Sequence, residues 1–205
     1  MVINKITTTE GEHTKIDLVY KETMLKTVEE MIIRVDEKDN ALGPIEKMEA
    51  HHKGILHRAF SILVFNSSKQ LLLQRRSLSK YHTPGLWTNT CCSHPRFGER
   101  TAHAVSRRLQ EEMGFQCALS EVFEFVYKTT FETDLHEYEF DHVFIGFYDG
   151  EVNINLEEVS EYKWLDLDAI KLDIEKSPDQ YTYWFKYLFA LAEDKIRASI
   201  NELPI

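Results

Sequence analysis

The segment at residues 87–95 (WTNTCCSHP) constrains the fold and the chemistry of this chain more than any other stretch. It contains two thiols, Cys91 and Cys92, and the imidazole of His94, directly after a Pro-Gly turn signal. In an extended segment, side chains two residues apart point to the same face. The segment is therefore predicted to be a short strand that delivers Cys92 and His94 to one cleft, with Cys91 pointing into the core.

Hydrophobic periodicity predicts more strands than helices in the rest of the chain. Residues 66–69 are expected to form a hairpin turn, and Gly43-Pro44 to break the chain. One helix is expected to have Thr101 as its N-cap and to end at Gly114. The strands are expected at residues 31–35, 56–66, 70–76, 121–131, 137–148 and 159–165, and the helices at 101–113, 166–172 and 178–202.

This order of elements predicts the α/β class, with one mixed sheet covered by helices. Residues 31–205 are expected to form a single domain. Residues 1–30 are expected to be an N-terminal extension, with partial helical character in its second half.

The composition narrows the class of protein and of ligand. No run is long enough to span a membrane, the N-terminus lacks a signal peptide, and three cysteines do not form a disulfide framework, so a cytoplasmic protein without a membrane partner is expected. The net charge of -10 argues against a nucleic-acid partner, and no oligomeric state is predicted. Basic residues nevertheless gather around the cysteine segment, which indicates a small anionic ligand such as a phosphate ester. They are Lys69, Arg75, Arg76, Lys80, Arg96, Arg100, Arg107 and Arg108.

Candidate metal ligands come from four separated places in the sequence. Glu137 and Glu139 are two apart on one predicted strand, where glutamate is depleted. Each histidine taken alone is more often a surface residue, but their combination with Cys92 and His94 favours a site. Three imidazoles and two carboxylates suit a borderline divalent ion such as Zn2+ or Mn2+. The expected ligands are His51, His57, His94, Glu137 and Glu139, whereas His52, His82, His103, His136 and His142 are expected at the surface or behind the ligands.

Cys92 is the catalytic candidate among the thiols, because it shares its face with His94. A thiol near a metal and several arginines is expected to have a lowered pKa, which suits proton transfer. The alternative is a structural zinc site. That site would need a closed set of four ligands in paired spacings, which the sequence lacks.

Residues 93–115 resemble the Nudix box, a loop and helix that present carboxylates to a diphosphate-bound metal. Glu99 stands eight residues before Arg107, and RLQEEMGF follows from Arg108. Two positions depart from the box, since Ser93 stands where it has Gly and Arg108 where it has Glu. A cation in place of a carboxylate weakens metal-assisted hydrolysis and strengthens phosphate binding. The less specific interpretation is an exposed amphipathic helix.

These departures and the cysteine segment together resemble one family, the type 1 isopentenyl-diphosphate delta-isomerases. The resemblance covers about residues 31–190 and implies a Nudix-type α/β/α sandwich with a mixed β-sheet. It rests on five separated matches in the same order, at residues 49–51, 53–60, 71–76, 84–95 and 137–139.

The resemblance implies an interconversion of isopentenyl diphosphate and dimethylallyl diphosphate, so the partner is a small prenyl diphosphate. One carbon gains a proton and another loses one, which requires two positioned groups on opposite faces of the substrate. The family pattern assigns these roles to Cys92 and Glu139, with Tyr127 supporting the carboxylate. Trp184 matches an aromatic that faces the carbocation-like state. The family usually has Pro before this tryptophan, where this chain has Tyr183.

The resemblance also implies two sets of binding residues. One Mn2+ or Zn2+ (or Mg2+) would be held by the three histidines and two glutamates given above. The diphosphate would be held by Lys47, Arg76, Lys80 and Arg108. A Mg2+ would bridge it to Glu112, with help from the backbone carbonyl of Cys92.

Two other functions remain as alternatives. A Nudix hydrolase of a nucleoside or prenyl diphosphate predicts an intact glutamate in the box and no need for Cys92, and Arg108 fails the first condition. A noncatalytic metal-binding module predicts neither a basic phosphate cluster nor a thiol in the site.

Overall fold

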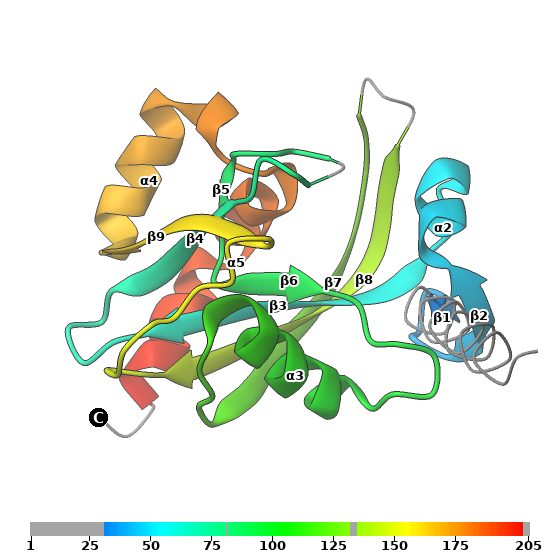
Figure 1. Ribbon diagram of the computed structural model, residues 1–205, viewed down its shortest axis with the longest axis horizontal. Helices are drawn as coiled ribbons and strands as arrows, with labels where there is room; N and C mark the ends of the chain where they lie inside the picture. Colours follow the sequence, from blue (N-terminus) through cyan, green and yellow to red (C-terminus); the bar gives the residue numbers. More distant parts are fainter. Residues whose placement is uncertain (1–30, 81, 132–134, 203–205) are drawn as a thin grey trace, which may run out of the picture.

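The computed structural model describes residues 31–80, 82–131 and 135–202, so the expected extension at residues 1–30 lies outside the described residues. Within these ranges, nine strands form one mixed sheet around β3 (Figure 1). The strand β3 (His57–Phe65) pairs antiparallel with β1 (Met31–Val35), β4 (Leu71–Arg76) and β6 (Cys91–Ser93), and parallel with β8 (His136–Phe147). Further out, β2 (Ala41–Glu46) pairs with β1, β7 (Leu119–Thr130) with β8, and both β5 (Trp87–Thr88) and β9 (Val159–Leu165) with β4.

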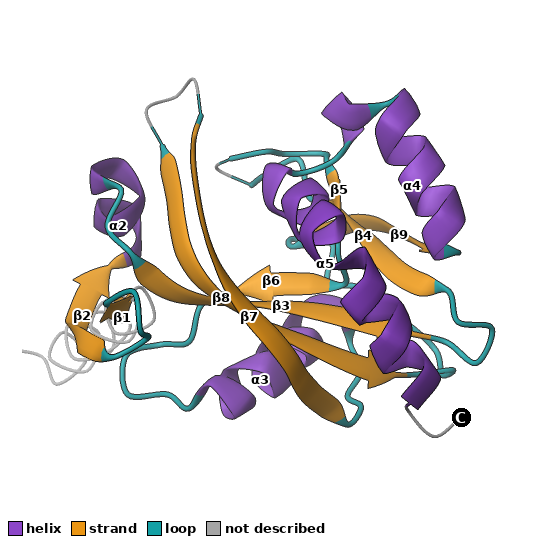
Figure 2. Ribbon diagram, turned by 180° about the vertical axis from the view of Figure 1, so that it is seen from behind, coloured by secondary structure: helices purple, strands orange, loops and turns teal. Residues whose placement is uncertain are grey.

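Side chains of β3 alternate between two cores, as a strand buried on both faces requires. Phe60, Ile62 and Val64 pack in one cluster with α3 (Thr101–Met113). Leu63 and Phe65 pack in another with α5 (Tyr183–Glu202). The two helices therefore cover opposite faces, α3 in front in Figure 1 and α5 in front in Figure 2, which confirms the α/β/α sandwich. The shorter helices α2 (Lys47–Lys53) and α4 (Leu167–Lys176) lie at opposite ends of the sheet.

Two local predictions are wrong for reasons visible in the backbone. Gly43-Pro44 lies inside β2 and does not break it, because β2 is an edge strand where the missing proline N–H is tolerated. Thr101 is the first residue of α3 and not its N-cap. Arg100 holds the cap position in an extended conformation (φ -72°, ψ 135°), because the turn at residues 96–99 delivers the chain one residue earlier. Gly114 ends the helix at φ 76°, as expected.

The last predicted helix and the cysteine strand are each interrupted. Residues 178–180 form a 3-10 turn, and α5 begins only at Tyr183. The break arises because the backbone at Tyr181 and Thr182 pairs with Trp87, whose carbonyl accepts from Thr182 N–H at 3.0 Å. The segment 87–95 is divided into β5 and β6, and the sequence did not predict α2. None of the described helices is long and apolar enough to cross a membrane.

Candidate active site

Strand register gathers the predicted residues at one end of β3. In the parallel pair of β3 and β8, His57 lies opposite Glu139. In the antiparallel pair of β7 and β8, Tyr127 lies opposite the same Glu139. On the other side of β3, β6 places Cys92 opposite Ser61, and His94 follows directly after β6. Segments from distant parts of the chain therefore meet around Glu139.

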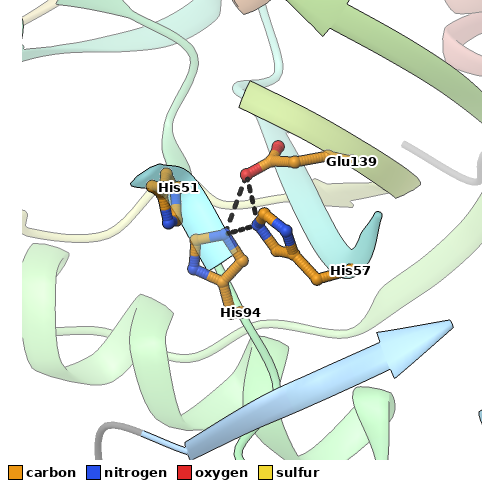
Figure 3. A group of neighbouring side chains, drawn as sticks. All are labelled: His51, His57, His94 and Glu139. Carbon is orange, nitrogen blue, oxygen red and sulfur yellow. Dashed lines mark hydrogen bonds and ion pairs between the residues drawn. The ribbon is translucent and has the colours of Figure 1, made fainter. Parts of the chain in front are cut away.

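Three histidines and Glu139 converge on one point (Figure 3). The Nε2 atom of His94 lies 2.8 Å from Glu139 Oε1 and 3.2 Å from His57 Nε2. The same carboxylate oxygen lies 3.5 Å from His57 Nε2. His51, from α2, completes the group, and the ligand atoms of all four residues lie within 4.8 Å of one another. Four ligand atoms this close together can bind a single metal ion. Three of them are imidazole nitrogens, which suit a borderline divalent ion.

Backbone carbonyls fix which nitrogen of two histidines faces the centre. His51 Nδ1 lies 2.7 Å from the carbonyl of Lys47, and His57 Nδ1 lies 2.7 Å from the carbonyl of Ile55. A carbonyl oxygen only accepts, so Nδ1–H is the donor in both rings. In the neutral form of both rings Nε2 then carries the lone pair, and metal-binding histidines are oriented in this way.

Two members of the group, His94 and Glu139, have the ionisation states of metal ligands. Burial lowers the pKa of His94 to about 3, although Glu139 works in the opposite direction. Burial disfavours the charge of Glu139, yet the hydrogen bonds of His57 and His94 hold its pKa well below the usual range. At His51, the neighbouring carboxylate of Glu137 outweighs burial and raises the pKa, and a bound cation replaces such a proton. The donor set therefore fits a divalent metal.

Two predicted carboxylate ligands lie outside this group of four. Glu137 borders it, with Oε2 at 3.4 Å from His51 Nε2 and Oε1 at 2.8 Å from His82 Nε2. Glu112, on α3, is buried and accepts a hydrogen bond from Gln74 Nε2 at 2.8 Å. Glu112 also pairs with the guanidinium of Arg108, so it lies on the side of the cations.

A pocket opens beside the metal-ligand group, and its walls contain every predicted catalytic residue and every predicted phosphate-binding cation. His94 and Glu137 also line it, whereas His51, His57 and Glu112 are not among its lining residues. One pocket therefore brings together a thiol, a carboxylate, a phenol, an indole and four cations. The predicted catalytic and phosphate-binding residues that line it are Lys47, Arg76, Lys80, Cys92, Arg108, Tyr127, Glu139 and Trp184.

The two adjacent thiols face opposite ways, as predicted. Cys91 is fully buried in the core beneath α3, and Cys92 lines the pocket. The expected lowering of the thiol pKa is wrong. Burial raises the pKa of Cys92 to about 12, although Arg76 lowers it, because a thiolate loses its hydration there. The thiol of Cys92 therefore holds its proton at neutral pH.

Hydrogen bonds hold the carboxylate and the indole in place. The hydroxyl of Tyr127 donates to Glu139 Oε2 at 2.6 Å. The Nε1–H of Trp184 donates to Thr88 Oγ1 at 2.9 Å. Tyr183 is the first residue of α5 and its ring lies 6.3 Å from that of Tyr127. At the first helical position the N–H has no intrahelical acceptor, so Tyr183 fits the position at which the family resemblance led us to expect proline.

The cations form a cluster that favours an anion. Burial, followed by the charges of Lys80 and Arg108, lowers the pKa of Lys47. Arg76 donates to the carbonyls of His82 and Thr83, at 3.1 and 3.2 Å. Glu158 pairs with Lys80 and, at 3.3 Å, with Arg108. Like charges gathered in a half-buried wall are stabilised when an anion binds among them.

The sequence analysis missed two residues of the site and did not single out His82. His82 was expected at the surface or behind the ligands, and it contacts the predicted ligand Glu137 while it lines the pocket. Its position in the sequence, between Lys80 and the Pro-Gly turn, could have indicated that it lies near the site. Gln74, which contacts Glu112, and Glu158, which pairs with Lys80 and Arg108, had no sequence feature that indicated a place in the site. Of the other histidines, His52 and His103 are exposed, His136 is half-buried, and His142 pairs with Asp39 and Glu121 away from the pocket.

Comparisons with known proteins show the family of this chain. The NUDIX domain family matches residues 55–185. An isopentenyl-diphosphate delta-isomerase 2 from Photorhabdus laumondii is 52% identical over 159 residues, which cover 78% of this chain and 90% of that protein. An isopentenyl-diphosphate delta-isomerase from Serratia proteamaculans is 48% identical over 158 residues, 77% of this chain and 88% of that protein.

Solved structures support the fold alone. A crystal structure of a Deinococcus radiodurans protein superposes with a TM-score of 0.60 at 22% identity, covering 72% of this chain and 90% of that one. A MutT protein from Methanosarcina mazei superposes with a TM-score of 0.56 at 22% identity, covering 70% and 95%.

Proposed function

This chain belongs to the isopentenyl-diphosphate delta-isomerases, which are built on the Nudix domain, and we propose that its pocket moves the double bond through proton transfers at Cys92 and Glu139. The reaction is the isomerisation of isopentenyl diphosphate to dimethylallyl diphosphate. The terminal methylene gains a proton, and the methylene two carbons further along loses one. The observation that carries the proposal is that one pocket holds both proton-carrying groups and four cations.

Cys92 and Glu139 reach the pocket from different strands, β6 and β8, on either side of β3. Two groups from separate strands suit a substrate that lies between them and exchanges protons on opposite faces. Tyr127 orients the carboxylate through its 2.6 Å hydrogen bond to Oε2. The thiol and the carboxylate each exchange one proton with carbon, and neither attacks phosphorus.

The hydrocarbon part of the substrate would lie against Trp184. A tertiary carbocation-like state is stabilised by an electron-rich aromatic face in a site that excludes water. Trp184 is 5% exposed, and its hydrogen bond to Thr88 fixes the plane of the ring. The Arg76 guanidinium lies 5.2 Å from the ring centroid, where the diphosphate end of the pocket begins.

We propose that Mn2+, Zn2+ or Mg2+ is held by His51, His57, His94 and Glu139, with Glu137 as the fifth ligand. When bound, such a cation tunes the acidity of the coordinated carboxylate. The chain fixes the site through the two Nδ1 hydrogen bonds to backbone carbonyls.

The diphosphate would be bound by Lys47, Arg76, Lys80 and Arg108, and Glu112 would hold the Mg2+ that accompanies it. Arg108 stands at the position where the Nudix box has a glutamate, and here its guanidinium pairs with Glu112. This substitution disfavours hydrolysis as the reaction. The substrate is thus a small prenyl diphosphate.

We further propose that residues 31–205 act as one domain and that the protein works in the cytoplasm. All three cysteines lie in the described part of the chain and are free thiols, as a reducing compartment allows.

Incubation of the protein with isopentenyl diphosphate and Mg2+ in D2O, followed by proton NMR, tests the reaction. Dimethylallyl diphosphate with deuterium in a methyl group is the expected product, because solvent protons pass through the exchanging groups. Release of inorganic phosphate would identify a hydrolase, and the proposal would be withdrawn.

The substitution Arg108→Glu is expected to raise the KM for isopentenyl diphosphate by about 10-fold or more, since a charge-assisted contact of about 1.5–3 kcal/mol is replaced by repulsion. Steady-state kinetics at saturating Mg2+ measure it. The control is Arg100→Glu, which makes the same charge change at an exposed residue outside the pocket. An unchanged KM in Arg108→Glu would remove Arg108 from the phosphate site.

A further inference from the structure

The loop between β4 and β5 places an additional imidazole in the site. His82 lines the pocket, and its side chain is 10% exposed. Its Nε2 atom lies 2.8 Å from Glu137 Oε1, while the other oxygen of that carboxylate, Oε2, lies 3.4 Å from His51 Nε2. His82 therefore contacts the oxygen of Glu137 that faces away from His51.

The tautomer of His82 differs from those of His51 and His57. An ionised carboxylate oxygen only accepts, so at 2.8 Å it faces an N–H of His82 and not a lone pair, which places the proton on Nε2. In His51 and His57 the donor is Nδ1–H and Nε2 is left for the metal. His82 is thus in the opposite tautomer, and its Nε2 serves to orient a carboxylate.

Aromatic contacts fix the ring of His82 in this position. Its centroid lies 5.6 Å from that of Trp184 and 5.9 Å from that of Phe131. The carbonyl of His82 also accepts from Arg76 Nη2 at 3.1 Å. One residue therefore contacts the metal side, the aromatic wall and a phosphate-binding cation.

We infer that His82 is a positioning residue that holds Glu137 toward the metal by donating from Nε2, while its ring packs against that of Trp184. The inference rests on the proposed role of Glu137 as a metal ligand. Loss of a partner that orients a metal ligand weakens metal affinity by about 10–100-fold.

Two variants separate the donor from the ring. His82→Gln keeps an N–H donor near the position of Nε2 and loses the ring, whereas His82→Phe keeps an aromatic ring and loses the donor. The full chain, stripped of metal, is titrated with Mn2+ and free Mn2+ is followed by electron paramagnetic resonance. His103→Ala, at an exposed histidine on α3, is the matched control.

The expected result is a Mn2+ dissociation constant raised about 10–100-fold in His82→Phe, near wild type in His82→Gln and unchanged in His103→Ala. Wild-type affinity in His82→Phe, or equal losses in both variants, would overturn the inference, because the donor would then have no separate role. The titration needs no substrate, so it gives its result even if the protein fails to isomerise isopentenyl diphosphate. The melting temperature of each variant shows that it is folded.

Discussion

Replacing Cys92 by alanine is expected to lower kcat for isopentenyl diphosphate by about 10²–10⁴-fold, the usual contribution of a positioned proton-transfer group. The thiol lines the pocket and holds its proton, because burial raises its pKa to about 12. The methyl group of alanine neither gives nor takes a proton, and no other thiol lines the pocket. Dimethylallyl diphosphate formation under saturating substrate and metal measures the effect.

The fold should survive this substitution. Cys92 is half-buried, and loss of one sulfur atom is expected to change the free energy of unfolding by no more than about 1 kcal/mol. Metal content should also be unchanged, since Cys92 is not in the group around Glu139. Cys117→Ala is the matched control, because Cys117 is a half-buried thiol that packs against the α3 core cluster. Full activity in Cys92→Ala would exclude the thiol from the reaction.

The local geometry of the cysteine segment was predictable because it depends only on strand periodicity. Alternation along an extended chain separates Cys91, which is in the core, from Cys92, which lines the pocket. The same period places Glu137 and Glu139 together on the inner face of β8. The wrong N-cap at Thr101 shows the limit of such local patterns, since the turn before α3 decides where the helix begins.

The assembly of the site was not predictable from spacing, because it depends on which strands pair and in which register. His57 meets Glu139 only through the parallel pairing of β3 and β8, two strands that are far apart in the chain. The family resemblance supplied the grouping that periodicity alone does not contain. Which of its two expected places His82 takes was not predictable, because it lies on a loop, where side-chain direction follows tertiary contacts and no period predicts it.

The thiol pKa was mispredicted for a related reason. The arginines near Cys92 are visible in the sequence, and Arg76 does lower the pKa of Cys92. The extent of burial is a tertiary property, and here desolvation of the thiolate outweighs the nearby positive charge. The same burial keeps His94 neutral, with a pKa of about 3.

Replacing Glu139 by glutamine is the second large effect, and we expect kcat to fall by about 10²–10⁴-fold even at saturating metal. The amide has nearly the same shape, so the hydroxyl of Tyr127 keeps an acceptor at the position where it now donates at 2.6 Å. What is lost is the group that exchanges a proton with carbon, together with the charged oxygen that His57 and His94 face. Steady-state kinetics and a Mn2+ titration are the two measurements.

The two roles of Glu139 separate across variants. Glu139→Gln should weaken Mn2+ binding by at least about 10-fold, as changes at metal sites do, and adding metal should restore binding but not turnover. Tyr127→Phe removes only the hydrogen bond to Oε2 and keeps the charged carboxylate. Mn2+ affinity should fall about 10–100-fold, as on loss of any partner that orients a metal ligand. At saturating metal kcat should still be lower by about 10–100-fold, the equivalent of a charge-assisted hydrogen bond. The control is Glu161→Gln, the same substitution at an exposed carboxylate on β9, which should change neither Mn2+ affinity nor kcat. Recovery of wild-type kcat in Glu139→Gln at high metal would show that Glu139 acts only as a metal ligand. Another residue would then have to carry out the second proton transfer.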